Sequence, residues 1–366
     1  MQWMKNLKEA GRAVPARGIR GILVAGVGCL VLGSGAGAAV AQERFNVSGN
    51  DVAIYNLVGS VQVVAGSGPD VTVEITRGGE DAAKLTVATG VIRERNTLRV
   101  IYPGRKILFK GHDGWWNSSL RVNDDGTFSD KIGGGHTVSI SNKGGGLDAH
   151  ADLVIKVPAG RKVSVYGAMG PMNARDVTAE LRLDSGSSPV SAVGVKGLLV
   201  VDVGSGDVDV TGCTGNIDVD TGSGSVNLTE VKAENIKVDT GSGDVRGRQL
   251  KAQTVLIDTG SGSVELVGVD APSVSADTGS GDISIGLVAD AEDISIDTGS
   301  GSVALVVPPS LGAKLYVEVG SGDIDVKVPM AEIQKEEDSV RGRIGDGAGR
   351  IHIETGSGGV SIAGTK

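Results

Sequence analysis

One short phrase repeats through the second half of this 366-residue chain and limits what the chain can fold into. It reads aliphatic, carboxylate, Thr, Gly-Ser-Gly, then Asp or Ser, then aliphatic residues alternating with polar ones. Successive copies begin 18 to 21 residues apart, and the last begins 36 residues after its predecessor. A period near 19 residues, built from short alternating segments and glycines without a helical pattern, predicts an all-β, parallel β-solenoid. The first glycine of each copy is expected to mark a corner: Gly204, Gly222, Gly241, Gly260, Gly279, Gly299, Gly320 and Gly356.

The copy at residues 216–228 shows why the repeat must stack. Ile217 and Val219 alternate with Asp218 and Asp220, so one face of the strand is apolar and the other is hydrated. The glycines that follow are expected to take backbone conformations that a Cβ would forbid. A single copy holds too few inward-facing aliphatic side chains to offset the conformational entropy that it loses on folding. Neighbouring copies are therefore expected to stack at about 4.8 Å per rung, which closes both the hydrogen bonds and the core.

The first 41 residues have the pattern of an export signal. Five basic residues precede an uncharged apolar run that starts at Gly21, and small residues lead to Ala41. Cleavage after Ala41 would place the mature chain in the periplasm, on the outer surface or in the medium, with no membrane span left. The rival interpretation is an uncleaved membrane anchor, which is disfavoured because the second half of the run is mostly Gly, Ala and Ser.

The composition of the mature chain excludes several kinds of partner and site. Residues 42–366 carry 30 Lys and Arg against 43 Asp and Glu, a net charge of −13, which argues against nucleic acid and anionic membranes as partners. Only Cys213 remains, so neither an intrachain disulfide nor a cysteine-based metal site can form. Its Thr-Gly-Cys-Thr-Gly setting predicts a small buried side chain beside a turn. Aromatic residues make up 3% of the chain, so we expect a core of Val, Ile, Leu and Ala.

Two regions depart from the clean repeats that residues 151–366 carry. Residues 42–103 alternate less regularly and are predicted to be N-terminal β coils or a cap, since a terminal rung needs a cover. Residues 104–150 are rich in Gly, Asn, Asp and Ser and contain Trp115 and Trp116. This insert is interpreted either as a loop that binds a sugar or peptide by stacking on the tryptophans, or as a surface excursion lying on the solenoid flank. The charged run at 329–347 is expected to be an exposed loop before a final rung.

Two columns of polar side chains are predicted to flank the corners. The residue after Gly-Ser-Gly alternates between Asp and Ser from Asp207 to Asp323, which would halve the charge density of a stacked column. Two residues before the first glycine every copy has a carboxylate, which would face water, accept hydrogen bonds from corner amides or hold cations such as calcium. Corner amides are favoured, because the GGxGxD pattern of calcium rolls is absent; no other cofactor is expected. The candidate calcium ligands are Asp220, Asp239, Asp258, Asp277 and Asp297.

The sequence offers little support for an enzyme. Asp-Thr-Gly-Ser occurs five times and is similar to the nucleophile loop of aspartic proteases. That chemistry needs two carboxylates that share one proton, whereas five copies at a fixed period predict a column along one edge. A polysaccharide-acting enzyme would need an acid and base pair on a solenoid face, and no such pair stands out in the sequence.

The iterated corners, the alternating strands, the Val-Pro-Ala-Gly segment at 157–160 and the export signal resemble the bacterial putative-adhesin family, a β-strand-repeat domain of unknown function found in envelope and secreted proteins. The resemblance covers roughly residues 43–366. It implies a right-handed β-solenoid and an adhesin-like label. The function expected for this chain is that of a non-enzymatic surface or envelope interaction protein, with an envelope polymer or a surface protein as the partner. It carries no catalytic residues over to this chain.

Overall fold

The computed structural model describes residues 42–110, 117–129 and 134–365. The predicted export signal, Trp115 and Trp116 lie outside these described residues. The described chain forms β-strands, joined by turns and one short 3₁₀ turn at Ala82–Lys84. The predicted fold class, an all-β parallel solenoid, is confirmed.

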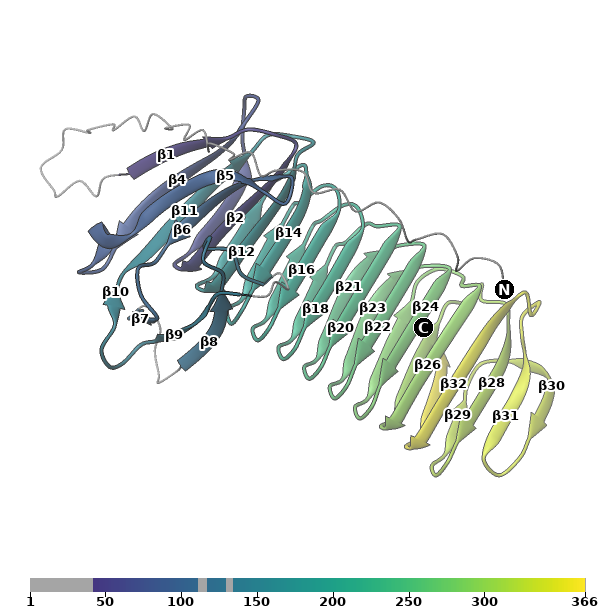
Figure 1. Ribbon diagram of the computed structural model, residues 1–366. Helices are drawn as coiled ribbons and strands as arrows, with labels where there is room; N and C mark the ends of the chain where they lie inside the picture. The colour runs from purple at the N-terminus through teal and green to yellow at the C-terminus, as the bar shows by residue number, and fades with distance from the viewer. Residues whose placement is uncertain (1–41, 111–116, 130–133, 366) are drawn as a thin grey trace, which may run out of the picture.

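Each regular coil gives one strand to each of two long sheets (Figure 1). The chain runs through the 15-stranded sheet, turns at Gly-Ser-Gly, and continues in the 14-stranded sheet. The regular strands of the 15-stranded sheet are β14 (Glu180–Ser185), β16 (Leu199–Val203), β18 (Ile217–Thr221), β20 (Asn235–Thr240), β22 (Thr254–Thr259), β24 (Ser273–Thr278) and β26 (Asp293–Ser300). Those of the 14-stranded sheet are β15 (Val190–Val193), β17 (Val208–Thr211), β19 (Val226–Thr229), β21 (Val245–Lys251), β23 (Val264–Asp270), β25 (Ile283–Leu287) and β27 (Val303–Val307).

The core is aliphatic and continuous from coil to coil. Parallel pairing puts like residues beside each other, so Ile217 lies between Leu199 and Ile236, and each is at most 2% exposed. A third, shorter side closes the coils, and its buried position is filled by Val195, Cys213 and Val231 in three successive coils. Burial raises the pKa of the Cys213 thiol above its usual value, as expected for an inert filler.

The N-terminal end of the stack is closed by antiparallel strands. The first coil pairs in parallel with the coil that follows the insert, and further strands cover its other side. In the 15-stranded sheet these are β12 (Lys162–Met169), β2 (Asp51–Val58), β6 (Arg95–Ile101) and, antiparallel at the edge, β5 (Thr86–Ile92). In the 14-stranded sheet they are β13 (Met172–Arg175), β3 (Val61–Ala65), β11 (His150–Val157) and the antiparallel pair β4 (Val71–Gly78) and β1 (Gln42–Val47).

The insert contributes a separate four-stranded sheet at this end of the molecule (Figure 1). Its order is β10 (Leu147–Asp148), β7 (Lys106–Leu108), β9 (His136–Ser141) and β8 (Asn117–Val122). The turn that follows β8 carries Phe128, which is 1% exposed and joins the main hydrophobic core. The insert is therefore anchored to the solenoid through its own apolar side chains.

The order of strands at the C-terminal end differs from the order in the chain. β32 (Gly349–Ser357) lies between β26 and β28 (Ala313–Val319) (Figure 1). In the other sheet, β33 (Val360–Gly364) lies between β27 and β29 (Ile324–Val326). The expectation that the last copy forms the final rung is therefore wrong. It forms the last rung but one, because its alternating residues fit equally well between the two coils that precede it in sequence.

Residues 329–347 also differ from the expected exposed loop. They form β30 (Met330–Lys335) and β31 (Ser339–Ile344), which extend the 15-stranded sheet antiparallel beyond β28. Val340 and Ile344 are 4% and 6% exposed, and Ile344 packs against the core. Glu332 and Lys335 lie on the exposed β30, and Glu336, Glu337 and Asp338 lie in the exposed turn after it, so this hairpin covers the last coil and presents a charged edge.

Candidate functional site

The first glycine of each corner is required by the close approach of neighbouring rungs. A Cβ added at Gly222 or Gly260 would lie 2.6 Å from the carbonyl oxygen of Gly204 or Gly241, the first glycine of the preceding corner. None of the eight predicted corner glycines has a positive φ in the left-handed range. The expectation of an unusual backbone conformation is therefore wrong for the first glycine of the corner, where contact between rungs excludes a side chain. It is confirmed for the second glycine at Gly224, whose φ is +153°.

The buried Thr before each corner ties one coil to the next. Its Oγ1 donates to the carbonyl oxygen of the second glycine in the preceding corner, at 3.2 Å for Thr259 and Gly243. Sequence reasoning gave this Thr no role, although its recurrence before Gly-Ser-Gly was a usable signal. Six residues make this bond: Thr221, Thr240, Thr259, Thr278, Thr298 and Thr355.

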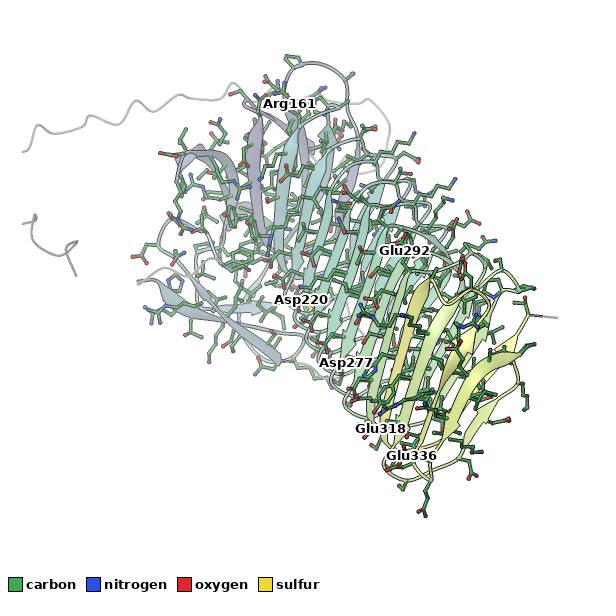
Figure 2. The ribbon with its side chains drawn as sticks, turned by 90° about the vertical axis from the view of Figure 1, so that its right-hand side faces the viewer. Arg161, Asp220, Asp277, Glu292, Glu318 and Glu336 are labelled. Carbon is green, nitrogen blue, oxygen red and sulfur yellow. The ribbon has the colours of Figure 1, made fainter. Side chains whose placement is uncertain are left out.

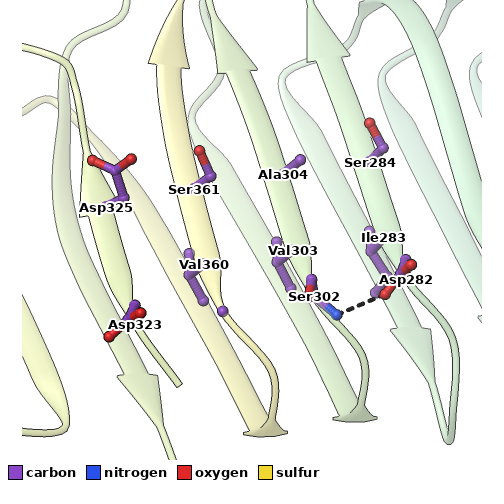
Figure 3. Close-up of a pocket in the computed structure, with 11 residues that line it drawn as sticks. Asp282, Ile283, Ser284, Ser302, Val303, Ala304, Asp323, Asp325, Val360 and Ser361 are labelled. Atoms are coloured by element: carbon purple, nitrogen blue, oxygen red, sulfur yellow. Dashed lines mark hydrogen bonds between the residues drawn. The ribbon is translucent and has the colours of Figure 1, made fainter. Parts of the chain in front are cut away.

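The alternation of Asp and Ser after the corner has a hydrogen-bonding reason as well as the predicted electrostatic one. The Asp244 Oδ1 accepts the backbone N–H of Ser263, in the next coil, at 3.0 Å. This bond, assisted by Arg246, lowers the pKa of Asp244. The same contact joins Asp207 to Ser225 at 2.9 Å. It also joins Asp282 to Ser302 at 2.8 Å (Figure 3).

The carboxylates before the corner form an open column on the outer face of the 15-stranded sheet (Figure 2). Within the described chain, no hydrogen bond or ion pair engages the five candidate calcium ligands, Asp220, Asp239, Asp258, Asp277 and Asp297. The expectation that this column accepts corner amides is therefore wrong. These side chains point away from the sheet two residues before the corner, and the residue after the corner takes the amide instead.

Charge accumulates along this column. Partial burial and then the neighbouring carboxylates raise the pKa of Asp220, Asp258 and Asp277. The shift is much larger at Asp184, at the N-terminal end of the column, where burial and then Asp202 raise the pKa to about 6. The Asp184 side chain is 13% exposed against 46% for Asp202, and the Ser129 hydroxyl of the insert donates to it at 3.0 Å.

Aromatic side chains continue the column beneath the insert. Tyr55 and Tyr166 occupy the positions beyond Asp184, and their rings stack at 4.5 Å. Phe128 meets Tyr55 edge to face with centroids 5.7 Å apart. This part of the insert lies on the solenoid flank, as one of the two interpretations expected. The tryptophan pair that the interpretation invoked lies outside the described residues, so the role of Trp115 and Trp116 stays a prediction.

The hollows of the described surface include a cleft and a shallower groove. A cleft of about 510 Å³ lies where the insert meets the N-terminal end of the solenoid, lined by Gly79, Glu80, Phe109, Lys110, Asp148 and His150. Within it Lys110 pairs with Asp148 at 2.6 Å, and Phe109 packs against His150 with ring centroids 5.6 Å apart. A shallower groove of about 390 Å³ crosses the 14-stranded sheet, where Ser284, Ala304 and Ser361 leave space between strands (Figure 3).

The described residues contain no grouped metal ligands and no membrane-spanning helix. No three His, Cys, Asp or Glu side chains among residues 42–110, 117–129 and 134–365 are grouped to hold a metal ion. Over the same ranges no helix is long and apolar enough to cross a membrane. Calcium binding by the column therefore stays a prediction.

The chain is similar to several solved structures. Among solved structures, one described as a putative adhesin from Parabacteroides distasonis ATCC 8503 is 12% identical, with a TM-score of 0.35, covering 88% of this chain and 96% of that chain. A second putative adhesin, from Bacteroides fragilis NCTC 9343, is 11% identical, with a TM-score of 0.33, and the match covers 88% of this chain and 95% of that chain. A putative cell adhesion protein from Clostridium sporogenes ATCC 15579 is 11% identical, with a TM-score of 0.17, covering 88% and 99%. No curated protein matches.

A protein-family model also matches the sequence. The model described as Toastrack DUF4097 matches residues 135–363, which include all the regular coils and the C-terminal end. The earlier resemblance to a family of unknown function is thereby confirmed. With more than half of its length inside this match, the chain belongs to the Toastrack DUF4097 family.

Proposed function

We propose that this protein is an exported, non-enzymatic interaction protein that uses the outer face of its 15-stranded sheet to bind an extended partner, such as an envelope polymer or a surface protein. The observation that carries the proposal is the run of five consecutive carboxylates from Asp220 to Asp297 that have no partner among the described residues. A flat, regular face with unpaired charge suits a partner that repeats along its own length. The structures described as adhesins are in keeping with this role.

The same column argues against catalysis. An acid and base pair needs two carboxylates whose environments push their pKa values apart. In the open part of the column, Asp220, Asp258 and Asp277 shift in the same direction for the same reasons. The larger shift at Asp184 belongs to a side chain that is only 13% exposed beneath the insert, outside this open part. A polysaccharide-acting enzyme on this face is therefore not part of the proposal.

The test is a binding screen of residues 42–366 against envelope polysaccharides and matrix proteins, with and without calcium. The variant Asp239→Asn/Asp258→Asn/Asp277→Asn should lose binding, because it removes the middle of the column. The matched control Asp209→Asn/Glu265→Gln/Asp325→Asn removes equal charge from the other sheet and should retain it. Equal binding by both variants would contradict the proposal, and loss of binding on chelation alone would assign the column to calcium.

A second candidate function is supported by the cleft beside the insert. Phe109 and His150 give it an aromatic wall, and Glu80 and Lys110 offer charged groups at its rim, which suits a sugar or another small polar ligand. If the insert binds, His150→Ala should weaken binding in the same screen while the column variant leaves it unchanged.

A further inference from the structure

The C-terminal coil, residues 349–364, separates two coils that are consecutive in the chain. Coil 293–307 lies on one side of it and coil 313–326 on the other, in both sheets. We call the space that it fills the slot. Everywhere else in the regular stack, consecutive coils pair directly with each other.

In both sheets the slot separates the two outer coils, whereas on the third, shorter side of the solenoid these coils remain in contact. Residues 308–312 join the two outer coils there, and the Gly312 N–H still donates to the Asp290 Oδ1 at 3.4 Å. The C-terminal coil contributes only β32 and β33. The two outer coils therefore meet along one edge and diverge by one strand spacing in each sheet.

The slot can close without any change of register. Ile353 lies between Ile296 and Val317 in one sheet, so removal of β32 would bring these two aliphatic residues opposite each other. Ile362 separates Leu305 from Val326 in the same way in the other sheet. The connection 308–312 has the same five residues in length as 288–292, which joins two coils that stack directly.

We propose that the C-terminal coil is an exchangeable element: its slot can close behind it, and the released coil can enter the slot of a second copy of this chain. Ile351, Ile353, Val360 and Ile362 of this coil are at most 1% exposed, so release into water alone is unfavourable. The slot of another copy buries the same side chains in the same register, which is the condition for domain swapping. Residues 345–348 form the hinge, with positive φ at Gly345 and Gly347.

Side chains on the outer face hold the coil in place. On the β28 side, the His352 ring stacks on Tyr316 at 5.0 Å, and the Arg341 guanidinium lies 4.7 Å from the centre of the Tyr316 ring. On the β26 side, Arg350 pairs with Asp293 at 2.9 Å. Loss of these contacts should speed exchange, and Arg350→Ala is the mildest way to remove one.

Exchange is tested with one cysteine on β26 and one on β32, placed on different copies, so that they can bridge only if the C-terminal coil of one copy occupies the slot of the other. The background is Cys213→Val, because Val fills that position in neighbouring coils. One copy carries Ser295→Cys and a second, with a different mass tag, carries His352→Cys; these positions are paired across β26 and β32. Mixing should give a disulfide-linked dimer of unlike copies that exceeds the dimers of like copies. The control pair Leu256→Cys and Ser275→Cys is paired in the same way between regular coils and should give none.

Slot closure has its own test in a single chain. Ser295 and Tyr316 lie two rungs apart, about 9.6 Å, which exceeds the roughly 7 Å that a disulfide can span. A Ser295→Cys/Tyr316→Cys bridge should therefore form only as the slot closes. The positive control is Ser295→Cys/His352→Cys in one chain, which should form its bridge. If that bridge forms but neither the Ser295–Tyr316 bridge nor the mixed dimer does, the proposal is overturned. It is also overturned if the Ser295–Tyr316 bridge forms without the mixed dimer, or if the control pair crosslinks as much as the slot pair.

Discussion

The regular coils and the two ends of this solenoid are held together by different contacts. Between regular coils the contacts are small and repeated: glycine against glycine, a Thr hydroxyl on a carbonyl, an Asp on an amide. At the ends they are large and unique, with Tyr55 stacked on Tyr166 at one end and Tyr316 on His352 at the other. Identical neighbours permit the closest packing, whereas a coil with a neighbour on only one side needs bulky side chains and antiparallel strands to complete it.

The largest effect is expected where a side chain is forced between regular rungs. Gly260→Val would place a Cβ 2.6 Å from the Gly241 carbonyl oxygen, which neither coil can avoid without breaking the stack. We expect the free energy of unfolding to fall by at least about 2 kcal/mol, measured by denaturant unfolding. Gly145→Val is the control, because nothing lies within 4 Å of its Cβ position, and it should be neutral. Equal stability of the two variants would mean that glycine contacts do not hold the regular coils.

The next effect concerns the boundary between the regular coils and the insert. The pKa of Asp184 is about 6 when folded, against an unperturbed 3.8, so protonation favours the folded state. Its favourable contribution is present below about pH 4 and is lost as the pH rises through about 6. Asp184→Asn should therefore stabilise the protein at pH 7.5 by about 1 to 2 kcal/mol and leave it unchanged at pH 3.5, measured by unfolding across this range.

Asp202→Asn is the matched variant for Asp184→Asn. Asp202 is the next carboxylate in the same column and is not covered by the insert. Because Asp202 is the second cause of the raised pKa of Asp184, this variant should flatten the pH profile, but by less than Asp184→Asn does. If both variants flatten the profile equally, the cause is the column as a whole rather than burial by the insert.

The sequence predicts the regular coils better than the ends, for a physical reason. The repeat period, the positions of the corners and the burial of Cys213 follow from the alternation of residues and the spacing of glycines over a short stretch of chain. The order of the last coils is not local, because Ile353 and Val317 fit the position beside Ile296 equally well. The role of Thr259 depends on a distance between rungs, and the position of Phe128 depends on packing between the insert and a distant strand. None of these distances has a counterpart in spacing along the chain.

A smaller effect is expected from the Thr that ties adjacent corners. Thr259→Val keeps the shape of the buried side chain and removes the hydrogen bond to the Gly243 carbonyl oxygen. The expected loss is about 1 kcal/mol in the free energy of unfolding. Thr211→Val, on the exposed face of β17, is the matched control and should cost less. A neutral Thr259→Val would show that the glycine contacts alone hold the corner.

The smallest effect on stability should have opposite signs in the column of Asp residues after the corner and in the column of carboxylates before it. Asp244 caps the Ser263 amide and its pKa is lowered, so its contribution to stability is present at neutral pH and is lost as acid protonates it. Asp258 has a raised pKa because of partial burial and its column neighbours Asp239 and Asp277, so ionisation slightly disfavours the folded state. At pH 7 Asp244→Ala should therefore destabilise the protein and Asp258→Ala stabilise it, each by a few tenths of a kcal/mol because both sites are solvated.

The double variant Asp244→Ala/Asp258→Ala tests whether these effects are independent. The two carboxylates lie on opposite sides of the corners and face different sheets, so their effects should add and nearly cancel at pH 7. At pH 3 Asp258→Ala should have lost its effect, since that carboxylate is then largely protonated, whereas the effect of Asp244→Ala should fade only at lower pH. Effects of the same sign at pH 7 would mean that total charge governs the stack. Opposite signs would mean that each column is set by its own contacts, with one column serving the fold and the other left available to a partner.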